Sequence, residues 1–257
     1  MKILNTVAAL REWRASVPEG KTIGLVPTMG ALHLGHASLL DASARENDYT
    51  VTTIFVNPTQ FNQSTDFEKY PKTFESDLAM CEKYGADVVF SPSSADEMYP
   101  DHFLYRVSEH QLSNELCGEF RPGHFEGVLT VVLKLLNLAK ADRAYFGEKD
   151  HQQLSLISGM ARAFFLETKI IPCPTVREAS GLAMSSRNLR LSPAEKEIAP
   201  GLYRVISGFT DPAQARTELE RLGFRVEYLV DREENGAIRR SVAAWLGEVR
   251  LIDNVRI

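Results

Sequence analysis

Two histidines three positions apart are the first residues of this sequence whose types and spacing could do chemistry. They are His33 and His36, and they lie in the stretch PTMGALHLGH (27–36), between an apolar run and a segment of helical period. Residues three apart share one face of a helix, so both imidazoles could donate hydrogen bonds to one phosphate, more strongly when protonated. Gly30 and Gly35 would let a bulky ligand approach the backbone, and a first helical turn favours an anion.

Other interpretations of this stretch stay open. Its residues fit neither GxGxxG nor GxxxxGK[ST], which argues against a dinucleotide motif or a P-loop. The two histidines could instead ligate a metal, but no cysteine or third histidine nearby completes a ligand set. They could also be first-turn histidines without a role.

Two further segments could contact phosphates. In GEKDHQQ (147–153) a strand is expected to enter a helix, whose first turn would offer Lys149 to phosphate, Asp150 to ribose and an outward Gln153. In MSSRN (184–188) two hydroxyls stand beside the planar donor fork of Arg187, which suits a polyphosphate. A charged run is also common at a solvated helix start, and such a loop is a plain linker in many proteins. The three segments share positions at strand ends or a domain junction, which favours a nucleotide site.

The elements that must position these residues follow from the apolar periodicity. Short β-branched runs alternate with stretches of helical period, which predicts an α/β fold with a parallel sheet between helices. The expected strands are 22–27, 50–56, 87–90, 144–146 and 169–172, and the expected helices are 35–46, 71–85, 125–139 and 150–165.

The pattern changes near residue 177. Two helices, 193–208 and 211–222, precede strands 225–230 and 249–252, with a polar break over 236–240. We therefore expect a first domain of residues 1–176 and a small α+β domain of residues 177–257. One continuous domain is the alternative.

The composition excludes several classes of protein. With 257 residues, 44% hydrophobic and 25% charged, the chain is typical of a globular protein. A net charge of -5 lacks the broad positive field of a general nucleic-acid binder. Cys81, Cys117 and Cys173 form no CxxC pair, which is typical of a reducing compartment. The charged N-terminus does not resemble a signal peptide, and no apolar run approaches the roughly 18 residues of a membrane span. We expect a cytoplasmic protein.

Five stretches in order carry a specific resemblance. They are PTMGALHLGH (27–36), FVNPTQF (55–61), RPGHFEGV (121–128), DRAYFGEKDHQQL (142–154) and MSSRN (184–188). The sequence resembles the pantoate–β-alanine ligases (pantothenate synthetases) from about residue 20 to 190, and the closing LIDNVRI resembles the last strand of that family. Class I aminoacyl-tRNA synthetases and other HIGH-type nucleotidyltransferases share only the HxGH-like and KMSKS-like elements.

The resemblance implies a Rossmann-like domain with helices on both faces of its sheet, a small C-terminal lid and a homodimer. The reaction would join (R)-pantoate to β-alanine using ATP and Mg²⁺, and it would release AMP and pyrophosphate through a pantoyl adenylate. His36 stands at the position of the family's catalytic residue, Gln60 and Gln153 would contact pantoate, and Gln60 would also contact β-alanine. The positions that match ATP contacts are Met29, Gly30, Ala31, Leu32, His33, Leu34, Gly35, His36, Gly147, Glu148, Lys149, Asp150, Val176, Met184, Ser185, Ser186 and Arg187.

Three rival functions remain on the residues alone. An adenylyl transferase acting on a phosphorylated acceptor would need basic residues where Gln60 and Gln153 stand. An aminoacyl-tRNA synthetase would need a basic appendage for tRNA, which the acidic balance argues against. A nucleotide-binding module without catalysis would bind ATP and release no pyrophosphate.

Overall fold

The computed structural model describes residues 1–62, 64–234 and 236–257, and the chain divides into two compact units. Unit 1 comprises Met1–Glu148 and Gln152–Cys173. Unit 2 comprises Lys149–His151 and Pro174–Ile257. The assignment of residues 1–176 to a nucleotide-binding domain and of residues 177–257 to a lid stays a prediction.

Unit 1 is built on a six-stranded sheet whose strand order is β1-β4-β3-β2-β5-β6, and every neighbouring pair is parallel. The strands are β1 (Lys2–Leu4), β2 (Ile23–Thr28), β3 (Tyr49–Ile54), β4 (Val88–Phe90), β5 (Arg143–Gly147) and β6 (Lys169–Cys173). The chain leaves β2 for β3 on one side, while β5 pairs with β2 on the other. Open α/β sheets bind ligands at such a reversal of strand order, at the carboxyl ends of the strands.

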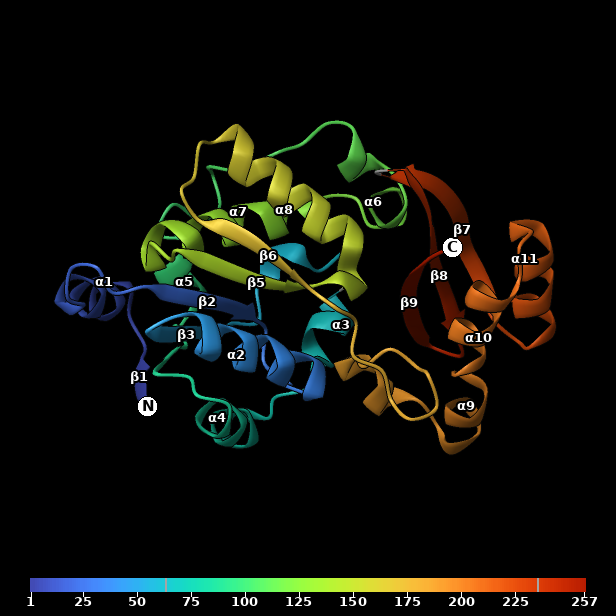
Figure 1. Cartoon of the computed structure of the whole chain (residues 1–257), viewed down its shortest axis with the longest axis horizontal. Helices are drawn as coiled ribbons and strands as arrows, with labels where there is room; N and C mark the ends of the chain where they lie inside the picture. The colour runs from blue at the N-terminus through green and yellow to red at the C-terminus, as the bar shows by residue number, and fades with distance from the viewer. Residues whose placement is uncertain (63, 235) are drawn as a thin grey trace. The chain divides into compact units, whose positions relative to one another are not determined.

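Helices cover both faces of this sheet. Figure 1 shows α7 and α8 on one face and α2 and α4 on the other. The helices are α1 (Val7–Ser16), α2 (Leu34–Glu46), α3 (Ser64–Glu68), α4 (Phe74–Lys83), α5 (Ala95–Met98), α6 (Cys117–Phe120), α7 (His124–Ala139) and α8 (His151–Ala163). Short 3₁₀ turns lie at η1 (Pro58–Gln60), η2 (Leu112–Asn114) and η3 (Glu148–Asp150). The parallel sheet between two helical layers confirms the predicted α/β class.

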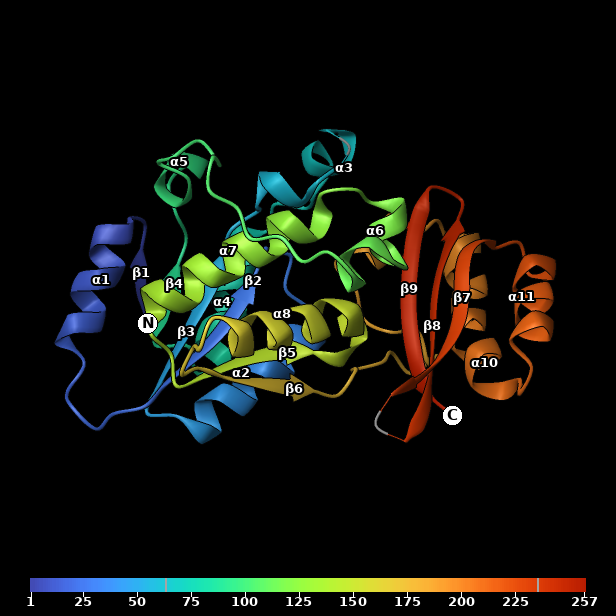
Figure 2. The same cartoon turned by 90° about the horizontal axis from the view of Figure 1, so that it is seen from above.

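Unit 2 has its own hydrophobic core between a sheet and helices. Its three strands are antiparallel in the order β7-β8-β9, and Figure 2 shows α10 and α11 on one face of them. The strands are β7 (Arg225–Glu234), β8 (Ala237–Leu246) and β9 (Val249–Arg256). The helical segments are η4 (Ser186–Arg190), α9 (Pro193–Ile198), α10 (Gly201–Gly208) and α11 (Pro212–Arg221). Leu202, Ile206 and Leu219 from the helices pack against Val242 and Leu251 from the sheet.

The expected elements differ from the observed ones in several places. The strand β1 and the helices α1, α3, α5 and α6 have no counterpart among the expected elements. The helix expected over 193–208 is two helices, α9 and α10, with Pro200 as the N-cap of the second. The helix expected from Pro71 begins at Phe74 instead.

Another difference concerns the polar break expected over 236–240, most of which lies in strand β8. Arg240 is fully buried there, and it donates two hydrogen bonds of 2.7 Å to Asp231 on β7. A cross-strand ion pair satisfies the polar residues, so polarity does not end the strand. Among the described residues, no helix has the length and apolar character to cross a membrane.

Candidate functional site

The loop that follows β2 has an unusual backbone held by one buried carboxylate. Gly30 has φ +83° and Ala31 has φ +50°, and the left-handed region costs a residue with a side chain about 1–2 kcal/mol. Asp77, only 2% exposed on α4, accepts hydrogen bonds from the backbone N–H of Ala31 at 2.9 Å and of Leu32 at 2.8 Å. A Cβ on Gly30 would lie 3.0 Å from Asp77 Oδ2, so the loop needs glycine for space as well as for φ.

The two histidines form a cap on α2 and not a pair on its face. His33 is the N-cap residue, and its Nδ1 accepts from the N–H of Gly35 at 3.1 Å. His36 lies in the first turn, and its Nδ1 accepts from the N–H of His33 at 3.3 Å. The ring centroids are 4.1 Å apart. A ring nitrogen that accepts cannot carry the proton, so this geometry favours neutral imidazoles that donate through Nε2. Protonated imidazoles are therefore not required, because the helix N-terminus itself favours an anion.

Gln60 lies beside this loop with its amide held in one orientation. It is 9% exposed, and its Nε2 donates to Met29 Sδ at 3.1 Å while its Oε1 accepts from Asn57 Nδ2 at 3.0 Å. Asn57 Nδ2 also donates to the carbonyl of Gly127 at 3.3 Å, and Asn57 Oδ1 accepts from the Tyr99 hydroxyl at 2.7 Å. A carbonyl can only accept, so Asn57 must turn its NH₂ toward Gln60, and Gln60 keeps its own NH₂ on the side of Met29.

The backbone of Gln60 is fixed by the RPGHFEGV stretch. The carbonyl of Gln60 accepts from His124 Nδ1 at 2.8 Å, and Arg121 Nη1 lies 3.0 Å from His124 Nε2. Because a carbonyl accepts and a guanidinium donates, His124 must be neutral with its proton on Nδ1. A Cβ on Gly127 would lie 2.4 Å from the carbonyl of Thr59, so only glycine lets α7 approach the turn that carries Gln60.

The end of β5 and the start of α8 carry the other candidates of unit 1. Gly147 ends β5, directly beside β2, and Glu148 follows it. Gln152 Nε2 donates to the carbonyls of Leu112 and Glu115, so its amide serves the packing of that loop. Gln153, the expected pantoate contact, is half-buried in the first turn of α8.

The remaining candidates belong to unit 2. Lys149 Nζ lies 3.6 Å from a carboxylate oxygen of Asp150. The N–H of Met184 donates to the carbonyl of Val176 at 3.0 Å, which pairs the two ends of a short hairpin. Ser185 Oγ accepts from the N–H of Arg187 at 3.3 Å and so caps the turn η4.

The candidates thus fall into two groups. Met29 to His36, Gln60, Gly147, Glu148 and Gln153 belong to unit 1, in which the Met29 loop and Gln60 are in contact. Lys149, Asp150, Val176 and Met184 to Arg187 belong to unit 2.

Two cysteines lack the properties of a nucleophile. Burial raises the pKa of the Cys81 thiol to about 12 and that of the Cys173 thiol to about 11. A thiol attacks as its thiolate, so neither group is reactive near neutral pH. Among the residues that the structure describes, no three His, Cys, Asp or Glu side chains gather as a metal-ligand set.

Comparison with known proteins identifies the family of this chain. The sequence matches the family model described as Pantoate-beta-alanine ligase over residues 2–256. A pantothenate synthetase of Bdellovibrio bacteriovorus is 50% identical over 256 residues, which is 100% of this chain and 99% of that protein. One from Legionella pneumophila is 49% identical over 248 residues, which is 95% of this chain and 96% of that protein.

Solved structures give the same result. A Francisella tularensis pantoate-beta-alanine ligase, described as complexed with beta-gamma ATP and beta-alanine, matches with TM-score 0.93 and 41% identity over 100% of this chain and 97% of that one. The pantothenate synthetase of Thermus thermophilus matches with TM-score 0.90 and 40% identity over 99% of both chains. With these matches over nearly its whole length, the chain belongs to the pantoate–β-alanine ligase family.

Proposed function

We propose that this ligase joins (R)-pantoate to β-alanine in two steps at the loop that follows β2. In the first step a carboxylate oxygen of pantoate bonds to the α-phosphorus of ATP, and the bond to the pyrophosphate oxygen breaks. In the second step the β-alanine amine bonds to the acyl carbon and gives up a proton. AMP leaves and keeps the oxygen that came from the pantoate carboxylate. Pyrophosphate, AMP and pantothenate are the products.

One observation supports this proposal most directly: in unit 1 the neutral amide of Gln60 contacts Met29, at the start of the loop that leads to the N-terminus of α2. The N-terminus of α2 with His33 and His36 offers N–H donors for phosphate oxygens. Gln60, whose amide is 3.1 Å from Met29 at the start of that loop, offers an uncharged NH₂ for pantoate. The crystallised Francisella tularensis ligase is complexed with an ATP compound and β-alanine, which correspond to two of the three substrates proposed here.

The charge on each donor suits its proposed partner. Negative charge grows on pyrophosphate as it leaves, so donors on the phosphates stabilise the transition state. The pantoate carboxylate must act as a nucleophile, and an ion pair with an arginine would lower its nucleophilicity. Gln60 and Gln153 can orient pantoate by neutral hydrogen bonds, so much of the catalysis would be positioning.

The full set of ATP contacts is proposed from the family motifs and this geometry. His36 is the proposed catalytic residue, because its Nε2 can donate to a phosphate while its Nδ1 accepts from the backbone. Gln60 and Gln153 are proposed to contact pantoate, and Gln60 also β-alanine. The proposed ATP contacts are Met29 to His36, Gly147 to Asp150, Val176 and Met184 to Arg187.

We propose Mg²⁺ as part of the MgATP substrate. The residues described offer no ready cage of acidic or imidazole ligands, and Mg²⁺ commonly takes phosphate oxygens and waters as its ligands. Its role on ATP would be to offset the charge of the phosphates.

Three further properties are proposed from the family resemblance. Residues 177–257 would act as a lid, since a pantoyl adenylate is open to hydrolysis and must be kept from water. The enzyme would act as a homodimer. It would work in the cytoplasm, and its three cysteines are free thiols, as is usual in a reducing compartment.

Isotope exchange between pyrophosphate and ATP tests the two-step proposal. With pantoate present and β-alanine absent, we expect radiolabel from pyrophosphate to enter ATP, because the adenylate forms before the amine is needed. Without pantoate no exchange should occur. Bound ATP with no pantoate-dependent exchange would instead indicate adenylyl transfer to another acceptor, or nucleotide binding alone.

A further inference from the structure

The last strand carries two buried polar residues that the proposed reaction leaves without a role. Asp253 and Asn254 lie next to each other on β9, in the LIDNVRI stretch, and they are 3% and 7% exposed. Asp253 Oδ1 also accepts from the N–H of Asn254 at 2.8 Å. Buried polar groups are costly unless they are hydrogen-bonded, so their partners indicate their purpose.

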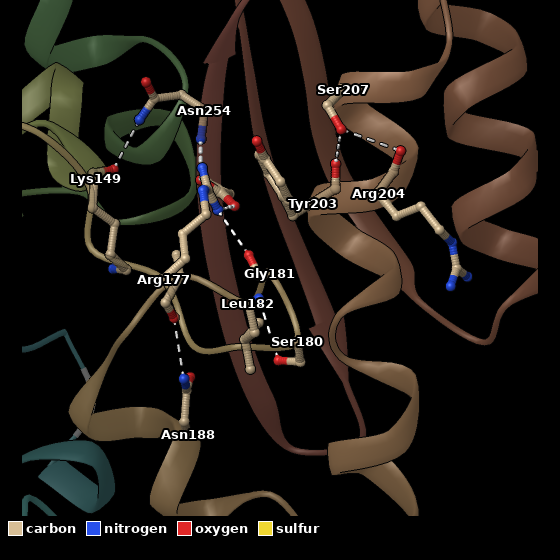
Figure 3. Close-up of polar contacts among 12 residues, drawn as sticks. Lys149, Arg177, Ser180, Gly181, Leu182, Asn188, Tyr203, Arg204, Ser207 and Asn254 are labelled. Carbon is tan, nitrogen blue, oxygen red and sulfur yellow. Dashed lines mark hydrogen bonds and ion pairs between the residues drawn. The ribbon is translucent and has the colours of Figure 1, made fainter.

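Asp253 holds Arg177 in a two-pronged ion pair. Arg177 donates through Nη1 at 2.6 Å and through Nη2 at 3.0 Å to the two carboxylate oxygens. The guanidinium carbon lies 3.6 Å from the ring centroid of Tyr203, on α10. The guanidinium also donates a hydrogen bond of 3.2 Å to the carbonyl of Gly181, which Figure 3 shows as a dashed line. Such a fork fixes direction as well as distance.

Arg177 lies in a short hairpin of residues 176–184, which leads into the MSSR segment (184–187). It forms an isolated β-bridge with Ala183. On either side of that bridge, Met184 donates its N–H to the carbonyl of Val176 at 3.0 Å, and Glu178 donates its own to Leu182 at 2.8 Å. Val176 and Met184, both among the proposed ATP contacts, therefore lie at the two ends of one hairpin, and the side chain of Arg177 connects that hairpin to β9.

Asn254 holds the second ATP-binding segment of unit 2. Its Nδ2 donates to the carbonyl of Lys149 at 3.0 Å, a contact visible in Figure 3. Its Oδ1 accepts from Nη1 of Arg239 on β8. A guanidinium can only donate, so Arg239 fixes the amide with its NH₂ toward Lys149.

We propose that Asp253 and Asn254 are positioning residues for ATP, the first acting through Arg177 on the hairpin and the second on the Lys149 turn. The proposal rests on the ATP contacts proposed above for Val176, Lys149 and the MSSR segment. Two adjacent residues of β9 thus set the spacing between two segments that must bind one nucleotide. Neither residue need touch the substrate.

Steady-state kinetics of Asp253→Asn and Arg177→Gln test this proposal. In Asp253→Asn one oxygen becomes an NH₂ that faces a guanidinium N–H, so the fork is lost with little change in volume. We expect the KM for ATP to rise between about tenfold and a hundredfold, the range for misplaced binding groups, while the KM for β-alanine stays within about twofold. The double variant should resemble either single variant, because both changes cut the same link.

Glu227→Gln is the matched control. Glu227 on β7 accepts from Arg250 on β9 at 2.8 Å and 2.7 Å, and the two side chains are 10% and 12% exposed. That pair is a partly buried ion pair in the same sheet, and the two contacts given for it do not reach the hairpin or the Lys149 turn. We expect Glu227→Gln to lower stability and to leave the KM for ATP unchanged.

Hydrogen exchange gives a readout independent of turnover. The amides of Glu178, Gly181 and Met184 donate within the hairpin, so peptides covering 176–184 should exchange faster in Asp253→Asn and not in Glu227→Gln. Asn254→Asp places a carboxylate against the carbonyl of Lys149 and should also raise the KM for ATP. If Asp253→Asn does not fold, Arg177→Lys keeps the charge, loses the fork and should show the same rise.

Several results would overturn the proposal. They are an unchanged KM for ATP in folded Asp253→Asn and Arg177→Gln, an equal rise in Glu227→Gln, effects that multiply in the double variant, or unchanged exchange of the hairpin amides. Failure of the proposed function would look different, because the unmodified enzyme would then lack pantoate-dependent pyrophosphate exchange.

Discussion

Replacing Asp77 by alanine should disturb the proposed ATP site, because Asp77 holds the backbone of the loop that follows β2. The Asp77 carboxylate accepts from the N–H groups of Ala31 and Leu32 and from the hydroxyl of Thr73 at 3.2 Å. It is the only acceptor described for those two amides in the loop that joins β2 to α2. Without it, the left-handed backbone at Gly30 and Ala31 loses its anchor.

The magnitude follows from the contacts. A buried amide that loses its acceptor costs about 1–3 kcal/mol, so two amides cost about 2–6 kcal/mol. The loop can reduce this cost by leaving the left-handed region, which returns about 1–2 kcal/mol at Ala31. We therefore expect Asp77→Ala to lower the free energy of unfolding by about 1–4 kcal/mol. The relaxed loop should also lower kcat/KM for ATP by about 10², the cost of misplacing binding groups by about 1 Å.

Urea unfolding and pyrophosphate–ATP exchange measure the two effects separately. Asp77→Asn keeps one acceptor oxygen and should fall between the wild type and Asp77→Ala in both assays. Asp41→Ala is the control, because Asp41 is an exposed acid on α2 whose partner Arg45 lies at 2.6 Å on the surface, and such pairs contribute little. Full exchange activity and full stability in Asp77→Ala would refute the role of the carboxylate.

Four further predictions follow. His36→Asn keeps an acceptor for the backbone, so stability should be retained while the rate of adenylate formation falls about 10²-fold. His36→Gln keeps a donor near the position of Nε2 and should retain more activity. Equal activity of the two variants would show that Nε2 takes no part in the reaction. Cys81 should not react with a thiol reagent at pH 8 until the protein unfolds, because burial raises the pKa of its thiol to about 12. A hydrogen bond from Lys21 lowers the pKa of Asp48 to about 2, below the unfolded value of about 3.9. The contribution of Asp48 to stability should therefore be present at neutral pH and be lost as the pH falls from about 5 toward 2. The midpoint of urea unfolding should change less between pH 5 and pH 2 in Asp48→Asn than in the wild type. Gly127→Ala places a Cβ 2.4 Å from the carbonyl oxygen of Thr59. Because α7 must then shift, we expect stability to fall by about 1–3 kcal/mol and the KM for pantoate to rise. Unchanged stability and an unchanged KM would mean that α7 can shift at no cost.

Much of unit 1 could be predicted because its strands are apolar on both faces. The neighbouring residues Leu25 and Val26 of β2 point to opposite faces and are 1% and 0% exposed, and parallel strands buried between helices show such continuous apolar runs. The strand β8 could not be predicted in the same way. Arg239 and Arg240 are charged residues that a sequence pattern places at the surface. They are buried because they form ion pairs with Glu234 and Asp231 on β7.

The candidate loops could be predicted, and the residues that hold them could not. The imidazole pair and the MSSR segment are visible as local spacings. Asp77 lies 46 residues from Ala31 in the sequence, and Asp253 lies 76 residues from Arg177. Each is an ordinary acidic residue until the fold brings its donors to it. The family membership and α/β class are confirmed, while the role of each proposed contact stays a prediction.

The fate of one oxygen atom tests the central claim of attack on the α-phosphorus. Pantoate labelled with ¹⁸O in its carboxylate should transfer one labelled oxygen to AMP, because the bond made by that oxygen in the adenylate is retained when the amine displaces AMP. Mass spectrometry of AMP after turnover with ATP and β-alanine measures this transfer. Labelled AMP is the predicted result. AMP without label, formed while all the label remains in pantothenate or passes to another phosphate product, would contradict the adenylate route.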